Sequence, residues 1–239
     1  FIFVEKVTEP AKELLRKFLS ENSDENLHFL FEENNVGYFR GLNIGIRYSK
    51  TLDTQFDYTV IGNNDLIFPN HFLKTLLKNT ILYKGYPVIS PNIITLDNIN
   101  QNPHLIKRIS IFRKFIYDLY FSNYNLALII NFISKITKKF TKRIDYLNHA
   151  KSGPIFMGYG ACYILTTDFF NLFEELNAPT FLMGEEAFLS DQIHKVNKEI
   201  FYDSEIIVNH HDHASCDNLQ VKKMWQITRE SYNLYKPLI

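Results

Sequence analysis

Two amides and a carboxylate, Asn63, Asn64 and Asp65, directly follow the apolar segment Tyr58 to Ile61. Hard cations such as Mg²⁺ and Mn²⁺ prefer oxygen ligands, and they commonly take one or two carboxylates together with phosphate oxygens and water. We therefore interpret Asp65 as a candidate ligand of a divalent cation that bridges a diphosphate. The alternative of an Asx-rich turn that caps the following helix stays open.

A second set of reactive groups lies near the end of the chain, where the carboxylates of Glu185 and Glu186 precede His210, His211 and His213. Adjacent carboxylates repel each other, so one of them can have a raised pKa and act as a general base. Imidazoles beside a carboxylate can complete a metal shell. Surface charge could equally explain the two glutamates, and a solvated polar loop could explain the histidines.

A third candidate is the stretch from Asn35 to Gly45, which carries Gly37 and Gly41 four residues apart at the start of a helix. Glycines let the backbone approach a ligand closely, and the amides of Asn35 and Asn43 add hydrogen-bond donors and acceptors. A Gly-rich turn before a helix is the simpler alternative.

The elements that must position these groups alternate between strands and helices, which is typical of an α/β fold. A helix is expected from Pro10, where Ala11, Leu14 and Phe18 share one face and Thr8 could cap the first turn. The other expected elements are strands at 1–4, 27–31, 58–61, 87–90 and 160–166, helices at 42–48, 69–77, 168–176 and from about 185, and short strands near 200 and 206.

Asn63 to Asp65 would stand at the carboxyl end of a strand, where open α/β sheets usually bind ligands. The pattern changes between about residues 97 and 151, where long aromatic and aliphatic runs are flanked by Lys and Arg. We expect a helical insertion there.

Composition narrows the class of protein. Lys plus Arg and Asp plus Glu are both 26, so the overall charge favours no polyanionic partner. Two cysteines, Cys162 and Cys216, indicate neither a disulfide framework nor a zinc site, and they favour a cytoplasmic setting. The apolar run Leu126 to Ile133 falls short of the roughly 20 residues that a membrane-spanning helix needs.

Five stretches occur in an order that resembles glycosyltransferase family 2, in particular rhamnosyltransferase-like enzymes of bacterial surface polysaccharide assembly. They are Asn35 to Gly45, Asn63 to Asp65, Gly160 to Cys162, Glu185 to Glu186, and His211 to Ser215. The resemblance implies a GT-A fold, which is Rossmann-like with a mixed central sheet and flanking helices. It also implies an inverting transfer from a nucleotide sugar such as dTDP-rhamnose or a UDP-sugar.

The resemblance assigns roles to individual residues. Asp65 and His211 would contact Mn²⁺ or Mg²⁺ on the donor diphosphate, although the neighbouring His210 and His213 leave the choice of histidine open. Glu186 would be the catalytic base and Glu185 would orient the acceptor. The residues expected to bind the nucleotide sugar are Glu5, Asn35, Gly37, Gly41, Asn43, Asn63 and Asn64.

Three departures from the family pattern concern the nucleotide pocket and the residues after the acidic pair. The first βα unit is missing before Phe1, so residues 1–239 are expected to form one GT-A domain without that unit and with the insertion at 97–151. Glu5 stands where relatives have Asp, and Gln192 where many have Arg. A sugar nucleotidyltransferase, a degenerate GT-A binding module and a nucleic-acid binder remain as alternatives. The last is disfavoured, because the basic stretch matches no recognised module.

The stretch His104 to Arg143 is strongly basic, with nine Lys and Arg against Asp118 alone. The stretch has a net charge of +8, and its basic residues flank a long run of apolar residues. This pattern is typical of a helix pair that lies at a membrane interface. Because family acceptors are often saccharides or lipid-linked saccharides at the cytoplasmic leaflet, we expect peripheral membrane association through 104–143, with Lys138, Lys139, Lys142 and Arg143 contributing. An ordinary soluble helical insertion is the alternative.

Overall fold

The computed structural model describes residues 1–6, 9–21, 26–136, 145–211 and 221–239. The sequence-based assignments to Thr8, Lys138, Lys139, Lys142, Arg143, His213, Ser215 and Cys216 lie outside these ranges.

A mixed six-stranded sheet forms the centre of the molecule, in the order β3-β7-β5-β8-β4 with β6 also pairing with β8. Its strands are β3 (Tyr58–Gly62), β4 (Leu66–Ile67), β5 (Val88–Thr95), β6 (Gly153–Ile155), β7 (Cys162–Thr166) and β8 (Ile200–His210). β5 and β8 run parallel, whereas the other pairs are antiparallel. The expected α/β fold with a mixed central sheet is confirmed.

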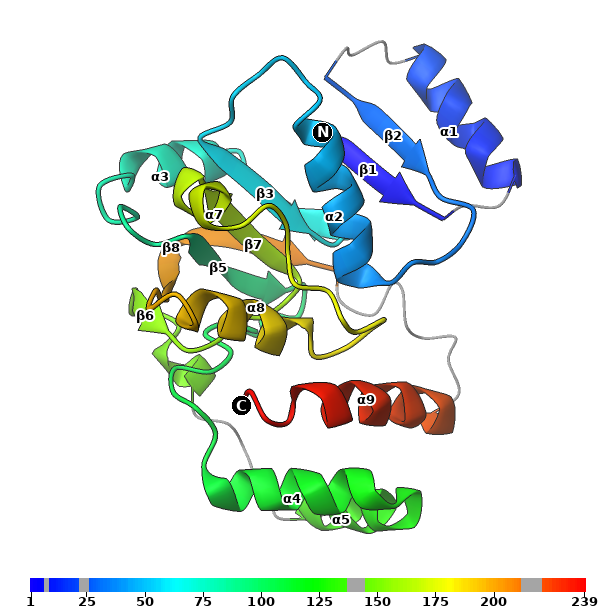
Figure 1. The fold of residues 1–239 in the computed structure, drawn as a ribbon, viewed down its shortest axis with the longest axis vertical. Coiled ribbons are helices and arrows are strands. Elements are labelled where there is room, and N and C mark those ends of the chain that lie inside the picture. Colours follow the sequence, from blue (N-terminus) through cyan, green and yellow to red (C-terminus); the bar gives the residue numbers. More distant parts are fainter. Residues whose placement is uncertain (7–8, 22–25, 137–144, 212–220) are drawn as a thin grey trace.

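Helices cover both faces of this sheet (Figure 1). One face packs on α2 (Tyr38–Ser49), α7 (Thr167–Leu172) and α8 (Glu185–His194) through buried residues such as Phe39, Phe169 and Leu189. The opposite face packs on α3 (Phe72–Lys78) through Phe72 and Leu76. Each helix therefore buries one apolar side against the sheet, as amphipathic elements do.

The N-terminal part forms a separate parallel pair, β1 (Ile2–Glu5) and β2 (His28–Phe31), with α1 (Glu9–Glu21) beside it. On its other side, α2 packs on β1, since a Cβ on Gly45 would lie 3.4 Å from Val4 Cγ2.

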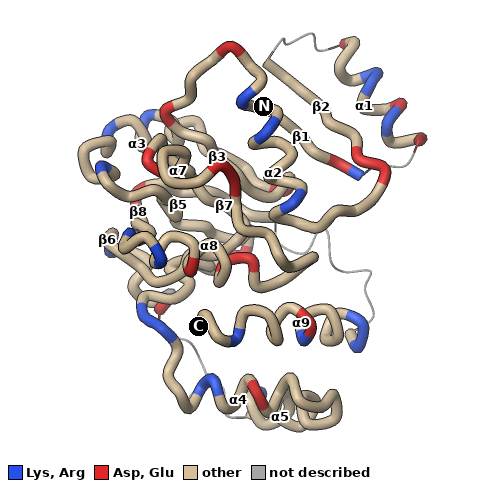
Figure 2. The backbone as a smooth tube through the Cα atoms, viewed as in Figure 1, with Lys and Arg blue, Asp and Glu red and all other residues tan. Residues whose placement is uncertain are grey.

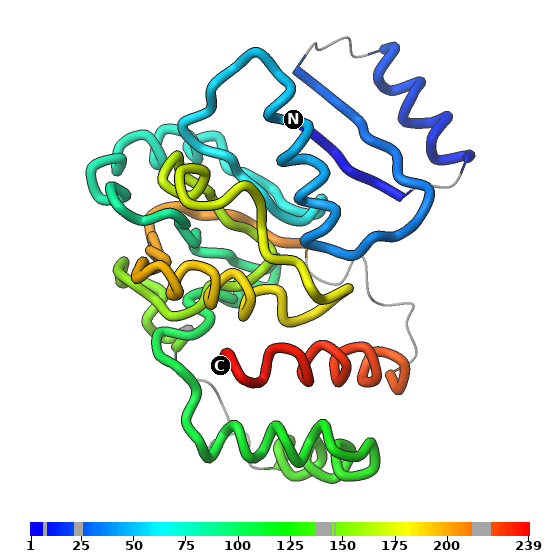
Figure 3. The backbone as a smooth tube through the Cα atoms, in the orientation of Figure 1, coloured from blue at the N-terminus to red at the C-terminus, as the bar shows by residue number. Residues whose placement is uncertain are grey.

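A third cluster of buried residues lies beneath α9 (Val221–Tyr235). Figure 3 shows α9 between the body of the molecule and a hairpin formed by α4 (Ile111–Ser122) and α5 (Tyr124–Ile136). The hairpin lies within the segment expected to be a helical insertion. No helix among the described residues is long and apolar enough to cross a membrane.

Several element boundaries differ from the sequence-based expectations. The two strands expected near residues 200 and 206 are one strand, β8, whose pairing with β5 shifts at Pro91 and Asn92 and leaves residues 204–206 outside the register. β5 continues to Thr95 through Pro91, because proline is tolerated at such an irregularity. α7 ends at Leu172 rather than at Leu176, whose backbone is held instead by Asn43.

Candidate active site

Asp65 lies in the short connection between β3 and β4, where backbone contacts on two sides fix it. β4 pairs with the end of β8, with Leu66 opposite His210, and the backbone N–H of His211 donates to the Asp65 carbonyl at 3.0 Å. The backbone N–H of Asn63 donates to the carbonyl of Ala161 at 2.9 Å. Asp65 is thus held between the start of β7 and the end of β8.

The side chain of His210 lies beside the Asp65 carboxylate. Its Nε2 atom is 3.2 Å from Asp65 Oδ1 and 3.2 Å from the Nδ2 atom of Asn63, and the ring is almost fully buried. On the other side of the ring, Nδ1 lies 2.8 Å from Gln101 Oε1. An amide oxygen only accepts, so this contact assigns the proton of the neutral imidazole to Nδ1.

This tautomer leaves two acceptors facing each other. Nε2 of His210 carries a lone pair, to which Asn63 can donate, and the neighbouring Asp65 Oδ1 is buried and accepts no hydrogen bond from any described residue. Two lone pairs at 3.2 Å need a positive charge near them, either a proton or a metal ion. Neighbouring ligands of an octahedral divalent cation lie roughly 3 Å apart, so the spacing of the two side chains suits such an ion.

The two described histidines of this stretch differ in their position relative to Asp65. His210 lies beside the Asp65 side chain, whereas the structure records only the backbone contact between His211 and Asp65, and His211 itself is exposed. The missed signal was strand alternation, because His210 continues the buried positions Ile206 and Val208 of β8. Within the described ranges, no group of three or more His, Cys, Asp or Glu could hold a metal ion by itself.

The acidic pair begins α8, after two consecutive residues with left-handed backbone, Met183 and Gly184. Glu186 Oε1 accepts a hydrogen bond from the backbone N–H of Gly160 at 3.2 Å. A Cβ on Gly160 would lie 2.6 Å from the same oxygen, so only glycine allows this approach.

Glu185 has a different environment from its neighbour. Its side chain is 4% exposed, and its Oε1 atom has no hydrogen-bond partner among the described residues. Burial, with a further contribution from the charge of Glu186, raises the pKa of Glu185 to about 7. The two carboxyl groups are therefore unequal, and the raised pKa belongs to Glu185 rather than to Glu186, the residue that the resemblance assigns as catalytic base.

Hydrogen bonds connect the acidic pair to the glycine-rich stretch and to the β3 end. The hydroxyl of Tyr38 donates to the carbonyl of Gly160 at 2.8 Å, and the next carbonyl, that of Ala161, accepts from Asn63. Burial raises the pKa of Tyr38 well above its usual range, and electrostatic interactions with Cys162, Glu186, Glu185 and Asp65 raise it further. Four of the five motif stretches therefore meet around Gly160, and the fifth lies mostly outside the described residues.

Gly37 shapes the start of α2 rather than an open loop. Its φ of +94° lies in the region that favours glycine, and a Cβ would lie 2.4 Å from the carbonyl oxygen of Phe181. Its backbone N–H donates to Asn35 Oδ1 at 3.0 Å. This tight contact orients Tyr38, the next residue, toward Gly160.

Asn43 and Gly41 lie inside α2. The amide of Asn43 is buried and spans the backbone of Leu176, donating to its carbonyl at 2.8 Å and accepting from its N–H at 2.9 Å. Both polar functions of this side chain thus hold the loop after α7. A side chain on Gly41 would meet open space.

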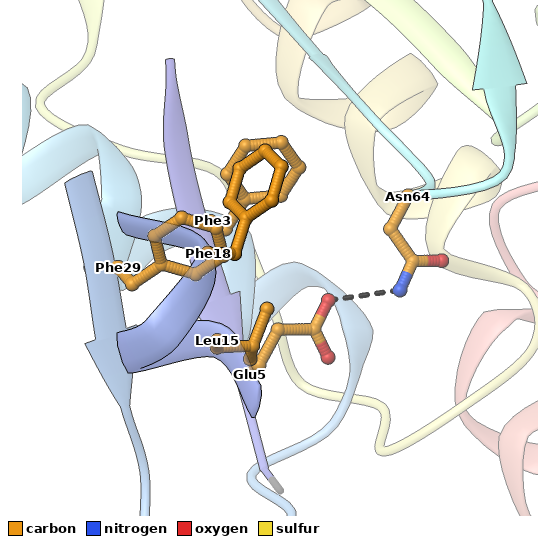
Figure 4. Close-up of a pocket in the computed structure, with 6 residues that line it drawn as sticks. All are labelled: Phe3, Glu5, Leu15, Phe18, Phe29 and Asn64. Carbon is orange, nitrogen blue, oxygen red and sulfur yellow. Dashed lines mark hydrogen bonds between the residues drawn. The ribbon is translucent and has the colours of Figure 1, made fainter. Parts of the chain in front are cut away.

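A pocket of about 430 Å³ adjoins Asn64, which is the residue before Asp65 (Figure 4). Its walls are Phe3, Leu15, Phe18 and Phe29, with Glu5 and Asn64 at one side. The rings of Phe3 and Phe29 stack with centroids 4.9 Å apart, and Asn64 Nδ2 donates to Glu5 Oε1 at 2.8 Å. The pocket therefore offers aromatic walls and one carboxylate to a planar ligand.

Comparisons with known proteins give a structural match without a sequence match. Neither a protein-family model nor a curated protein matches the chain. A crystal structure of GalNAc-T7 with UDP, GalNAc and Mn²⁺ is similar with a TM-score of 0.55 and 11% identity.

That match covers 87% of this chain and 36% of the other, so this chain spans about a third of that protein's length. At this identity the match establishes the fold. The mixed sheet with flanking helices is that of the GT-A glycosyltransferases.

Proposed function

We propose that this chain is an inverting glycosyltransferase that moves a sugar from dTDP-rhamnose or a UDP-sugar to a saccharide or lipid-linked saccharide acceptor in polysaccharide synthesis. The observation that carries the proposal is the hydrogen-bonded connection of Asn63, Gly160, Tyr38 and Glu186 beside the Asp65–His210 pair. Residues far apart in sequence meet at the ends of the strands of a GT-A sheet.

The donor diphosphate would bind beside Asp65 and His210, which would hold a divalent cation together with phosphate oxygens and water. When bound, the cation supplies Lewis-acid stabilisation of the charge on the leaving diphosphate. Gln101 orients the imidazole for this role by accepting a hydrogen bond from its Nδ1–H group.

The nucleobase would enter the pocket lined by Phe3 and Phe29. Uracil and thymine share an imide N–H, which can donate to the Glu5 carboxylate while the ring lies against aromatic walls. Asn64 holds Glu5 in position through its hydrogen bond. The pocket adjoins the Asp65–His210 pair, because Asn64 lines the pocket and is the residue before Asp65 in the chain.

Glu186 would act as the catalytic base. A proton on the buried Glu185 leaves the negative charge of the pair on Glu186, whose carboxylate is partly exposed and anchored by Gly160. Glu186 takes the proton of the acceptor hydroxyl while that oxygen attacks the anomeric carbon from the face opposite the diphosphate. One displacement inverts the anomeric configuration, and no covalent sugar–enzyme bond forms.

The proposal includes a cytoplasmic location, peripheral on the inner face of the cytoplasmic membrane, where lipid-linked acceptors would be presented. No nucleic acid is involved.

Thermal unfolding with a panel of nucleotide sugars, with Mn²⁺ or with EDTA, tests the donor site. We expect a UDP-sugar or dTDP-rhamnose to stabilise the protein by about 3 kcal/mol at a hundredfold excess over Kd, and only when the cation is present. Asp65→Asn should abolish this stabilisation, because the amide keeps the shape of the side chain but removes its charge. Asp53→Asn, at an exposed aspartate outside the site, is the matched control.

Two outcomes would count against the proposal in different ways. Equal stabilisation with EDTA, or in Asp65→Asn, would show that the metal assignment is wrong. Stabilisation by none of the nucleotide sugars would contradict the donor site itself.

A further inference from the structure

The α4–α5 hairpin presents an unusually apolar outer surface to solvent. Ile111 and Phe112 are 89% and 74% exposed, and Phe132 and Ile136 are 66% and 70% exposed. Further exposed apolar side chains of the hairpin are Phe115, Leu119, Leu126, Leu128 and Ile129. Large exposed apolar patches are uncommon on soluble proteins and mark binding surfaces, so this concentration of exposed apolar side chains on one hairpin indicates such a surface.

The opposite side of the hairpin is fixed on α9. Phe121 stacks on Tyr232 with ring centroids 4.5 Å apart, and the Tyr232 hydroxyl donates to Asp118 at 2.9 Å. At the other helix, Tyr124 packs edge-on against Trp225 at 5.4 Å. The exposed stripes therefore belong to a hairpin that is already attached to the protein by its inner side.

Basic residues outnumber acidic ones in the hairpin and in the segment that leads into it. Between residues 104 and 136 the sequence has five basic side chains and a single acid, Asp118. That acid is engaged by Tyr232 and lies 3.9 Å from Lys236 of α9. Figure 2 shows basic residues where the chain enters α4 and within α4 itself. The five are Lys107, Arg108, Arg113, Lys114 and Lys135.

We propose that the outer surface of this hairpin binds an anionic lipid surface, with the apolar stripes of both helices in the headgroup and acyl boundary and the basic side chains on the lipid phosphates. Long Lys and Arg side chains reach headgroups while their neighbours are buried, which suits this mixture of residues. A second copy of the chain fits less well, because pairing two such surfaces would bring two sets of basic side chains together.

The position of the hairpin gives this binding a consequence for the site. α9 carries the hairpin through Tyr232, and on the same helix Ser231 donates to the carbonyl of Leu182, two residues before Gly184. A membrane-bound hairpin would thus hold the start of α8 near the lipid surface. This consequence rests on the proposed function, whereas lipid binding itself requires no sugar donor.

Co-sedimentation with liposomes of phosphatidylcholine alone, or mixed with phosphatidylglycerol, tests the proposal directly. We expect binding to the anionic liposomes only, weakened at 0.5 M NaCl because salt screens headgroup charge. Phe112→Ser/Phe132→Ser should lower the partition coefficient about tenfold or more. Lys107→Gln/Lys135→Gln should lower it about fivefold for each charge removed.

Matched controls lie on α3 and the loop after it, where side chains are equally exposed. Leu73→Ser/Ile81→Ser removes two exposed apolar side chains of 63% and 86% exposure, and Lys74→Gln/Lys84→Gln removes two exposed charges. Both controls should bind like the wild type. Trp225, the one tryptophan of the chain, contacts Tyr124 of the hairpin, so an unchanged emission spectrum verifies that each variant keeps the hairpin docked.

Three results would overturn the inference. The first is equal binding to neutral and anionic liposomes at low salt. The second is an equal loss of binding in the α3 controls. The third is an absence of lipid binding together with a concentration-dependent dimer that Phe112→Ser/Phe132→Ser dissociates, which would assign the surface to a second copy. A protein that binds lipid but no nucleotide sugar would refute the proposed function and leave this inference standing.

Discussion

Glu185 and Glu186 are adjacent in the chain, but the protein treats their carboxyl groups differently. Burial isolates Glu185, whereas Glu186 accepts the N–H of Gly160 at the surface of the site. A carboxyl group in an apolar surrounding holds its proton at neutral pH, and a neighbouring negative charge strengthens this effect. Because the pair titrates as a unit, protonation of one group affects the charge available to the other.

The stability of the protein should depend on pH through Glu185. Its pKa rises from 4.5 to about 7 on folding, so the folded state binds more protons between these values, and stability falls as pH rises through 7. Glu185→Gln mimics the protonated group, so it should stabilise the protein by about 3 kcal/mol at pH 8 and by almost nothing at pH 4.5. Urea unfolding between pH 4.5 and 8 measures the difference. Glu199→Gln, at an exposed glutamate, should leave the pH dependence unchanged.

Glu186→Gln should separate donor binding from transfer. The amide keeps the shape of the side chain but cannot accept the acceptor proton, so kcat should fall by about 10² to 10⁴ while donor affinity is retained. Release of nucleoside diphosphate in the presence of acceptor, together with nucleotide titration, checks both quantities. Normal transfer by Glu186→Gln together with an inactive Glu185→Gln would identify the buried Glu185 as the catalytic base instead.

The sequence alone identified Asp65 and the two glutamates as candidate site residues. Polar groups directly after an apolar strand or at the start of a helix are local patterns that a sequence shows. It could not place Gln101, whose contact with His210 spans 109 residues and depends on the path of β8. The sequence also could not predict that the amide of Asn43 spans the backbone of Leu176, 133 residues away. Local pattern identifies polar groups, and tertiary packing decides which partners they contact.

At the scale of elements, α9 is the helix that the sequence-based reading omitted. It contacts both the hairpin and the segment before α8, through Tyr232 and Ser231 respectively. The ring of Tyr235 also lies over Gly184, where a Cβ would be 2.3 Å from the ring. The merged strand β8 and the shortened α7 were missed for a related reason, since their ends are set by partners distant in sequence.

Gly184→Ala should show that α9 positions the acidic pair. Gly184 has φ +84° and Gly85 has φ +86°, but only Gly184 is crowded by Tyr235. Both alanine variants should lose about 1 kcal/mol from the left-handed backbone, and Gly184→Ala should lose roughly 1–3 kcal/mol more, together with transfer activity. Urea unfolding and kcat measurements compare the two variants. Tyr235→Ala should lower the free energy of unfolding less in the Gly184→Ala background than in the wild type. Equal losses of stability in Gly184→Ala and Gly85→Ala would show that backbone strain alone causes the effect.

At the scale of the whole molecule, the two sheets differ in how well they are buried. Val88, Ile164 and Tyr202 of the central sheet are 0% exposed. All residues of β1 and β2 are only half-buried, and α1 has no buried residue. A two-stranded pair with little buried surface is marginally stable by itself. The proposed nucleobase pocket therefore lies on a less buried part of the described fold than the central sheet.

Hydrogen exchange should reveal this difference and its coupling to the donor. In the free protein, amides of β1 and β2 should exchange at least about a hundredfold faster than those of β5 and β8, because they open without unfolding the central sheet. UDP or dTDP with Mn²⁺ should slow exchange in β1 and β2, since a base between Phe3 and Glu5 binds only the closed pair. Mn²⁺ alone is the control, and Glu5→Gln should weaken the protection.

Two results would contradict these expectations. Equal protection of β1 and β8 before nucleotide is added would contradict the difference in stability. Protection by nucleotide that is confined to the central sheet would show that the base binds elsewhere.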